Sequence, residues 1–244
     1  MNLTGKTALV TGSTSGIGLG IAQVLAQAGA TLILNGFGDV DAAKDAVAQY
    51  GKTPGYHGAD LSDEAQIADM MRYAESEFGG VDILINNAGI QHVSPIETFP
   101  VDKWNAIIAI NLSSVFHTTR LALPGMRARN WGRIINIASV HGLVASKEKS
   151  AYVAAKHGVV GLTKTIALET AWTLPQIEAM ASVVHDEHNL AASVSSGSFR
   201  TDGMLVLPCS IKSLSAIANS YNETLIPRAA DVTLKERRRL VLRS

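Results

Sequence analysis

The chain has 244 residues, with 21 basic and 21 acidic side chains, 47% apolar residues and a single cysteine. This length fits one medium-sized globular domain or two small ones. The balanced charge argues against a nucleic-acid-binding protein, and the lone Cys209 excludes an internal disulfide or a cysteine cluster around a metal. We expect a cytoplasmic enzyme without a membrane segment, because no apolar run approaches the roughly 18 to 20 residues that span a bilayer.

Short apolar segments alternate with helical patterns along residues 1–170, as in repeated strand-helix-strand units. The segments are apolar throughout, which is typical of parallel strands covered on both faces. We therefore predict an α/β fold with a Rossmann-like doubly wound parallel sheet. The predicted strands are Thr7–Val10, Thr31–Leu34, Pro54–Gly58, Ile83–Asn86 and Arg133–Ala138. The predicted helices are Ile17–Ala28, Ala42–Gln49, Glu64–Phe78, Asp102–Arg127 and Ala151–Thr170.

The pattern changes after Thr170, so residues 171–244 are predicted to form a separate, atypical segment. A helix is predicted over 173–187, followed by a loop rich in serine and glycine over Ser193–Asp202. A strand over Met204–Leu207, a helix over Lys212–Ser220 and a last apolar stretch over Leu240–Leu242 follow. The charged run Lys235–Arg239 is interpreted as a solvated face.

A glycine-rich segment joins the first predicted strand to the first predicted helix. Glycines there let the backbone approach a phosphate, and the helix N-terminus offers free N–H donors. Glycine spacing alone is a weak signal, because it also occurs in tight turns, but its place between strand and helix indicates a pyrophosphate-binding loop. The residues assigned to a dinucleotide cofactor in this loop are Gly12, Thr14, Ser15, Gly16, Ile17 and Gly18.

The type of dinucleotide follows from the charges near this loop. No basic residue stands in it or just after the second strand, where a ribose 2′-phosphate would need one, so NAD is favoured over NADP. Asn35 stands where the usual acidic partner of the ribose is expected. Further cofactor contacts are assigned after the third and fourth strands, at Asp60, Leu61, Asn87, Ala88 and Gly89. The alternatives are that Asp60 caps a helix near Ser62 and that the asparagine-glycine segment is a simple turn.

Tyr152 and Lys156 lie four residues apart in a helical pattern, so both side chains point from one face. A free tyrosine is a poor base at neutral pH, but an adjacent ammonium favours the phenolate and makes Tyr152 a usable general acid/base. Ser139 ends the fifth predicted strand beside the same edge of the sheet and offers a hydroxyl to a substrate oxygen. Asn111 lies in the long fourth helix, and its alternative role is an exposed or kink-associated polar residue.

Together the segments Thr11–Gly18, Asn86–Gly89 and Tyr152–Lys156, with Asn111 and Ser139, resemble the short-chain dehydrogenase/reductase family over residues 1–170. The resemblance implies that Tyr152 exchanges the hydroxyl proton while Ser139 steadies the carbonyl oxygen. It also implies that Lys156 binds the cofactor ribose and tunes Tyr152, which itself contacts the cofactor. Asn111 would hold a relay water.

A narrower resemblance points to the branch of this family that oxidises D-3-hydroxybutyrate. It rests on the segments Leu34–Asp39, Gly89–His92, Ile135–Ser139, His141–Ser146 and Lys149–Tyr152. Gln91, His141 and Lys149 lie close in sequence to the catalytic loops and offer neutral donors and one cation for a carboxylate. The resemblance implies that these three bind the acid group of a small 3-hydroxy acid. The alternatives are a solvated loop lysine and a packed loop histidine.

The family pattern is not recognisable after Glu169, where it calls for a sixth strand, a lid over the substrate and a seventh strand. The segments Ser195–Met204, Pro208–Ser210 and Arg228–Arg238 instead resemble the middle of a flavin prenyltransferase, so the chain is interpreted as a chimera joined near residues 167–170. Arg228 and Lys235 are the implied phosphate contacts, but the remainder of that family's site is not recognisable. An impaired NAD-binding fusion product and a prenyltransferase remnant are therefore the alternatives to an active dehydrogenase.

The strand-helix-strand pattern near the C-terminal end is expected to dock as the sixth and seventh strands of the sheet, with a right-handed crossover. The family resemblance implies a homo-oligomer. A dimer through Asp102–Arg127 and Ala151–Thr170 is expected, and a tetramer is not favoured. We expect a small hydroxy acid as substrate, with no nucleic acid, membrane or metal as partner.

Overall fold

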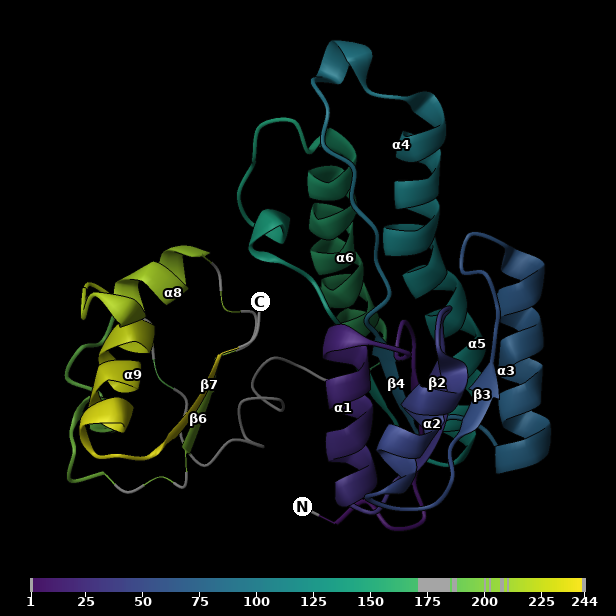
Figure 1. Ribbon diagram of the computed structural model, residues 1–244, viewed down its shortest axis with the longest axis horizontal. Coiled ribbons are helices and arrows are strands. Elements are labelled where there is room, and N and C mark those ends of the chain that lie inside the picture. The colour runs from purple at the N-terminus through teal and green to yellow at the C-terminus, as the bar shows by residue number, and fades with distance from the viewer. Residues whose placement is uncertain are drawn as a thin grey trace. The chain divides into compact units, whose positions relative to one another are not determined.

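The computed structural model describes residues 2–170, 185, 188–199, 201, 203–206, 209 and 211–242. The chain divides into two compact units, Met1–Thr163 and Lys164–Ser244 (Figure 1). The boundary falls inside the helix α6, earlier in the chain than the predicted division after Thr170. The helix predicted over 173–187 lies outside the described residues, apart from His185.

Unit 1 contains a sheet of parallel strands in the order β3-β2-β1-β4-β5, and the predicted doubly wound α/β fold is confirmed. The strands are β1 (Thr7–Val10), β2 (Thr31–Asn35), β3 (Gly55–His57), β4 (Ile83–Asn86) and β5 (Arg133–Asn136). The helices are α1 (Gly16–Gln27), α2 (Val40–Ala48), α3 (Glu64–Phe78), α4 (Val101–Ile108), α5 (Ser114–Ala128) and α6 (Ser150–Glu169). Short helical turns are η1 (Ile96–Thr98), η2 (Ala109–Ser113) and η3 (Val140–Gly142).

Burial explains why these segments form strands. Every residue of β1 and β4 is buried, as expected for central strands with helices on both faces. Successive side chains of β1 enter two different cores: Ala8 and Val10 join the cluster that contains Ala22 of α1, whereas Leu9 joins the cluster that contains Met70 of α3. The sheet is therefore the middle layer between two layers of helices.

The prediction of a single helix over Asp102–Arg127 is wrong in one respect. The chain forms α4, then the π-helical turn η2, and then α5. Such widened turns are rare and are frequently found at functional sites. Asn111, a poor helix former, lies within η2 and is the one sequence signal that marks the interruption.

The stretch Val101–Ala128 is long and apolar enough to cross a membrane, contrary to the expectation that the sequence has no such run. Within unit 1, however, its second half packs against α3, with Ala122 and Met126 in the shared core. Core helices of globular domains pass the same test of length and composition, so this helix is weak evidence for a membrane span.

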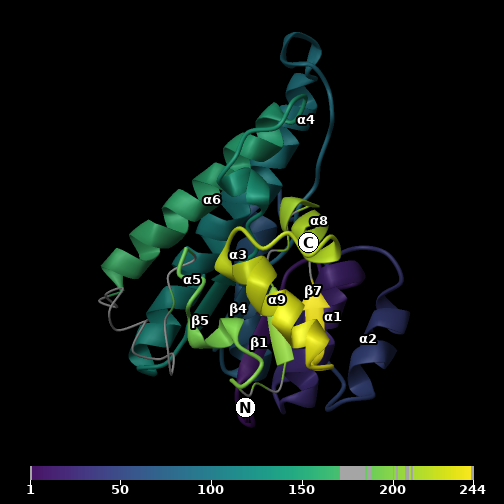
Figure 2. The ribbon, with the colours of Figure 1, turned by 90° about the vertical axis from the view of Figure 1, so that its left-hand side faces the viewer.

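Unit 2 contains β6 (Gly203–Val206), α8 (Ile211–Ala218), α9 (Leu225–Lys235), β7 (Arg239–Leu242) and the short turn η4 (Ser193–Ser195). The predicted parallel relation of the two strands is confirmed, and α9 packs against both of them (Figures 1 and 2). Within the described residues they form a two-stranded sheet of their own. The expectation that they dock on the main sheet stays a prediction.

The helix α9 (Leu225–Lys235) was not predicted from the sequence. Its buried residues Leu225, Ala229 and Val232 recur at helical spacing, and Pro227 lies in the first turn, where a proline is tolerated. The charged run that follows is exposed, as predicted, with the exception of Arg238. The guanidinium of Arg238 donates hydrogen bonds to the carbonyl oxygens of Phe199 and Gly197.

Gly18 provides a test of the packing between α1 and the loops at the end of the sheet. A Cβ at this position would lie 2.1 Å from the carbonyl oxygen of Gly12 and 2.6 Å from Nδ2 of Asn87. We expect Gly18→Ala to lower the free energy of unfolding, measured with urea, by about 1–3 kcal/mol. Gly161→Ala on α6 is the matched control, because nothing lies within 4 Å of its Cβ position. Equal losses in both variants would contradict this packing.

Candidate active site

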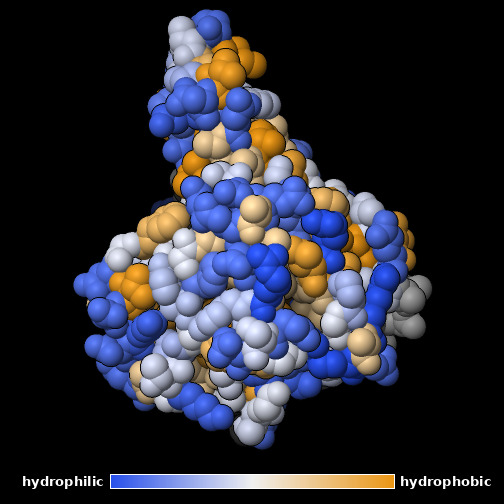
Figure 3. Space-filling model, turned by 90° about the vertical axis from the view of Figure 1, so that its right-hand side faces the viewer, coloured by the Kyte–Doolittle hydropathy of each residue, from blue (hydrophilic) through white to orange (hydrophobic). Residues whose placement is uncertain are grey.

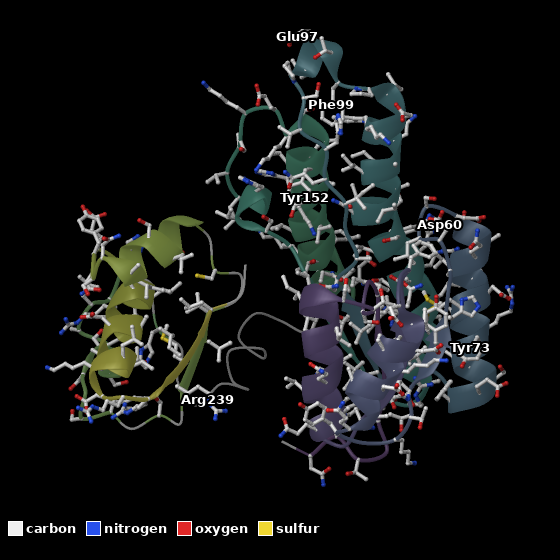
Figure 4. The ribbon with its side chains drawn as sticks, viewed as in Figure 1. Asp60, Tyr73, Glu97, Phe99, Tyr152 and Arg239 are labelled. Carbon is white, nitrogen blue, oxygen red and sulfur yellow. The ribbon has the colours of Figure 1, made fainter. Side chains whose placement is uncertain are left out.

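The strand order reverses between β1 and β4, and the crevice at the carboxyl ends of these strands is where ligands of open α/β sheets bind. The loops that follow β1, β4 and β5 carry most of the residues predicted for the site. Tyr152 on α6 and Asp60 after β3 both lie beyond this end of the sheet (Figure 4). The topology therefore brings together segments that are far apart in the sequence.

The loop after β1 is bound tightly to the loop after β4. Nδ2 of Asn87 donates to the carbonyl oxygens of Thr11 (3.0 Å) and Gly12 (3.1 Å), and Oγ1 of Thr11 accepts from the backbone N–H of Asn87 and Ala88. Gly12 has a φ of +61°, and a Cβ there would lie 2.9 Å from Cα of Ala88. Only glycine permits this close approach.

The start of α1 fits the phosphates of a dinucleotide. The helix begins at Gly16, and the side chain of Ser15 makes no capping hydrogen bond. A Cβ at Gly16 would meet nothing within 4 Å, so this face of the loop has open space beside it. The N–H groups of a first helical turn, with the positive end of the helix dipole, are suited to an anion.

Asn35 is bonded to the glycine-rich loop through its backbone: its carbonyl oxygen accepts from the N–H of Ser13 at 2.7 Å, and its N–H donates to Oγ of Ser13 at 3.0 Å. Its side chain is 1% exposed, and Nδ2 donates to the carbonyl oxygens of His57 and Ala59, both at 3.0 Å. The amide is thus bonded to the protein backbone, and the segment beyond it is the part that a ribose could reach. Phe37, which the sequence analysis did not single out, is exposed there, and its carbonyl oxygen accepts from Oγ1 of Thr14 at 2.6 Å.

Asp60 does not cap a helix. Its Oδ1 accepts from the backbone N–H and the hydroxyl of Ser62, both at 2.8 Å, which closes a local turn. The residue that caps α3 is Asp63, whose pKa is lowered by hydrogen bonds, first of all from the Gln66 side chain. Leu61 between them is buried.

Lys156 is a buried cation one helical turn from Tyr152. Its Nζ donates to the carbonyl oxygen of Ile137, just beyond β5, at 2.6 Å, and lies 5.7 Å from the centre of the Tyr152 ring. Burial lowers the pKa of Lys156 to about 8. The sequence predicted the lysine and the tyrosine on one helix, but nothing in a sequence marks a backbone carbonyl such as that of Ile137.

Ser139 and His141 lie on the loop that follows β5, and the His141 ring packs against Tyr152. Oγ of Ser139 accepts from the backbone N–H of His141 at 3.2 Å, which fixes the start of η3. The His141 ring lies edge-on to the Tyr152 ring, with 6.1 Å between the ring centres. Nδ1 of His141 is buried and makes no hydrogen bond within the described part of the chain.

Asn111 is 1% exposed, so the alternative of an exposed polar residue is wrong, whereas its association with a helix interruption is borne out. Its Oδ1 accepts from the backbone N–H of Ile90 at 2.8 Å, and its Nδ2 donates to the carbonyl oxygen of Ile90 at 2.9 Å. Asn111 therefore fixes the loop after β4, which also carries Gln91.

The loops that carry Gln91 and Lys149 are joined to each other. The backbone N–H of Ser94 donates to the carbonyl oxygen of Glu148 at 2.9 Å, and Glu148 has a positive φ. Gln91 is exposed and Lys149 is half-buried. Figure 3 shows apolar side chains on the projection formed by η1 and the start of α4, where Ile96 and Val101 are highly exposed.

The pKa of Lys156 gives a test of its burial. Lys156 has a pKa of about 8 in the folded protein against 10.5 for a free lysine side chain, so the unfolded chain binds more protons between these values. Stability contributed by this residue therefore rises as the pH rises from about 8 to 10.5. As the pH rises through this range, we expect the free energy of unfolding of the wild type, measured with urea, to increase by roughly 1–3 kcal/mol relative to that of Lys156→Met. Parallel pH curves for the two proteins would contradict the burial, and Lys164→Met, at an exposed position on the same helix, is the control.

Comparison with known proteins gives consistent matches. A family model described as short chain dehydrogenase matches residues 6–184. D-beta-hydroxybutyrate dehydrogenase of Cupriavidus necator is 72% identical over 173 residues, which cover 70% of this chain and 67% of that protein. The enzyme of the same name from Rhizobium meliloti is 61% identical over 170 residues, which cover 68% of this chain and 66% of that protein. The chain thus matches about two thirds of the length of these relatives.

A solved structure of a metagenomic short-chain oxidoreductase in complex with NADP has a TM-score of 0.66 and 34% identity, over 68% of this chain and 77% of that one. The family match ends at residue 184. The resemblance of the later segment to a flavin prenyltransferase, and the chimera that it implies, therefore stay predictions.

Proposed function

The chain belongs to the short-chain dehydrogenase family of oxidoreductases, and from that premise we propose that it interconverts D-3-hydroxybutyrate and its 3-keto acid with NAD. Two highly similar relatives carry that activity in their names. The observation that carries the proposal is the buried ammonium of Lys156 beside Tyr152, with the ring of His141 edge-on to the same tyrosine. These groups can move a proton and bind an acid within one site.

The cofactor would lie along the carboxyl ends of β1 and β4. Its pyrophosphate would be held by the loop Gly12–Gly18 and the start of α1, beside Asn87, Ala88 and Gly89. Its adenine end would lie toward Asp60 and Leu61, and Asn35 would act by holding the loop Gly12–Gly18 through its backbone bonds to Ser13. When bound, the nicotinamide ring supplies the hydride acceptor for oxidation.

Tyr152 would take the proton of the substrate hydroxyl during oxidation. The ammonium of Lys156 favours the phenolate form of the tyrosine by its charge, and it would also bind the cofactor ribose. Ser139 would donate a hydrogen bond to the same substrate oxygen. The side chain of Asn111 is hydrogen-bonded to the backbone of Ile90. We propose that Asn111, within η2, would hold a relay water that returns the proton to solvent.

The acid group of the substrate would be bound by Gln91, His141 and Lys149. Gln91 and Lys149 lie on loops that are joined by the hydrogen bond between Ser94 and Glu148. The ring of His141 contacts that of Tyr152. One cation with two neutral donors is suited to a single carboxylate. We also propose that the protein pairs through α4–α5 and α6, as the family resemblance implies.

Replacing Tyr152 tests the catalytic role. We expect Tyr152→Phe to lower kcat for D-3-hydroxybutyrate about 10²- to 10⁴-fold, because the ring remains but cannot exchange a proton. NADH formation measures the rate, and calorimetry with NAD checks that the cofactor still binds. Tyr50→Phe, at an exposed tyrosine, is the control.

A panel of hydroxy acids and simple alcohols tests the substrate, and preference for an alcohol without an acid group would refute the substrate proposal.

Replacing Phe37 tests the choice of cofactor. The segment after β2 carries the exposed carboxylate of Asp39 and no cation, which disfavours a 2′-phosphate. We expect Phe37→Arg to raise kcat/KM for NADP about tenfold, which corresponds to about 1.4 kcal/mol. Phe37→Gln, which is polar but uncharged, should give no such gain. If wild type uses NADP as well as NAD, the proposed preference is wrong.

A further inference from the structure

Helix α6 is fastened to the end of β5 at two points. The first is the bond from Nζ of Lys156 to the carbonyl oxygen of Ile137. The second joins side chains: Nδ2 of Asn136 donates to Oγ1 of Thr163 at 2.9 Å. Asn136 and Ile137 are consecutive, and Lys156 and Thr163 are two helical turns apart on one face. The two bonds therefore hold both the position and the rotation of the helix.

The bond at Asn136 belongs to a chain of side-chain hydrogen bonds across the end of the sheet. Oδ1 of Asn136 accepts from Nδ2 of Asn86 at 2.9 Å, and Oδ1 of Asn86 accepts from the hydroxyl of Thr118 at 2.8 Å. Thr118 belongs to α5, Asn86 ends β4 and Asn136 ends β5. The chain thus connects α5, β4, β5 and α6 in that order.

The direction of each hydrogen bond in this chain is determined. Thr163 donates its own proton to the carbonyl oxygen of Val159 at 2.7 Å, so it can only accept from Asn136. Asn136 must then present its oxygen to the amide of Asn86. Thr118 and Asn86 are 0% and 4% exposed, so a polar group left unpaired at that end of the chain is costly, whereas Asn136 is half-buried and Thr163 is exposed.

We propose that Asn136 and Thr163 are positioning residues for the reaction. Asn136 lies three residues before Ser139 at the end of one strand, and Thr163 lies on the helix that carries Tyr152. The link between them therefore sets the separation of the two hydroxyl groups that would share the substrate oxygen. This inference rests on the proposed function, in which Tyr152 and Ser139 act together.

Thr163→Val tests the link, because valine keeps the shape of threonine but cannot accept a hydrogen bond. We expect kcat for 3-hydroxybutyrate to fall about 5- to 50-fold, with KM for NAD nearly unchanged, because the phosphate loop lies elsewhere. Thr163→Ser keeps the hydroxyl and should restore most of the rate. Thr170→Val is the matched control, because it removes the same kind of intrahelical bond, from Thr170 to Ile166 at 2.9 Å.

Combination with Tyr152→Phe separates positioning from general stability. If Thr163 acts through Tyr152, adding Thr163→Val to Tyr152→Phe should lower the residual rate no further. Equal losses in both backgrounds, or wild-type activity in Thr163→Val, would overturn the inference while leaving the proposed function intact. Full activity in Tyr152→Phe alone would instead overturn the proposed function.

Hydrogen exchange provides a readout that needs no turnover. In protein without added cofactor or substrate, we expect Thr163→Val to speed amide exchange in the first turns of α6, around Tyr152, by about fivefold or more, whereas Thr163→Ser and Thr170→Val should not. Unchanged exchange in Thr163→Val would mean that the link does not hold the helix, and the inference would be wrong.

Discussion

A buried ammonium group fastens α6 to the end of the parallel sheet, and the rest of the candidate site depends on this contact. The ammonium of Lys156 is buried and donates a hydrogen bond to the carbonyl oxygen of Ile137, and burial lowers the pKa of Lys156 to about 8. A cation kept in such a place at a cost in stability is typical of a functional site. Its charge lies one turn from Tyr152, so the same contact places the helix and tunes its tyrosine.

The parallel sheet supplies the framework for this contact, because the carboxyl ends of its strands meet at one edge. Polar links then join the loops in pairs: Asn87 to the β1 loop, Asn111 to the β4 loop, and Ser94 to Glu148. Each link uses a short side chain or a backbone group, so each loop is held without filling the crevice. The site is thus built of hydrogen-bonded loops on a scaffold whose core lies on both faces of β1 and β4.

The sequence predicted the elements with the strongest local signals. The bounds of β1, β4 and α3 agree with the structure, because continuous apolar runs mark the two strands and a helical pattern marks α3. The interruption at η2 was marked only by Asn111, a poor helix former, and the bond from Lys156 to Ile137 was not predictable, because a backbone carbonyl has no residue signature. The parallel pairing of β6 with β7 agrees with the predicted strand-helix-strand pattern, but the helix α9 that packs on them was not predicted.

The most direct measurement follows the hydrogen at C3 of the substrate. D-3-hydroxybutyrate with deuterium at C3 would be incubated with the protein and NAD, and the products analysed by mass spectrometry. If the site works as proposed, each 3-keto acid formed is accompanied by one NADH that carries the deuterium, and Tyr152→Phe strongly slows both. Deuterium released into water, or a labelled substrate that stays unchanged, would contradict the proposed chemistry.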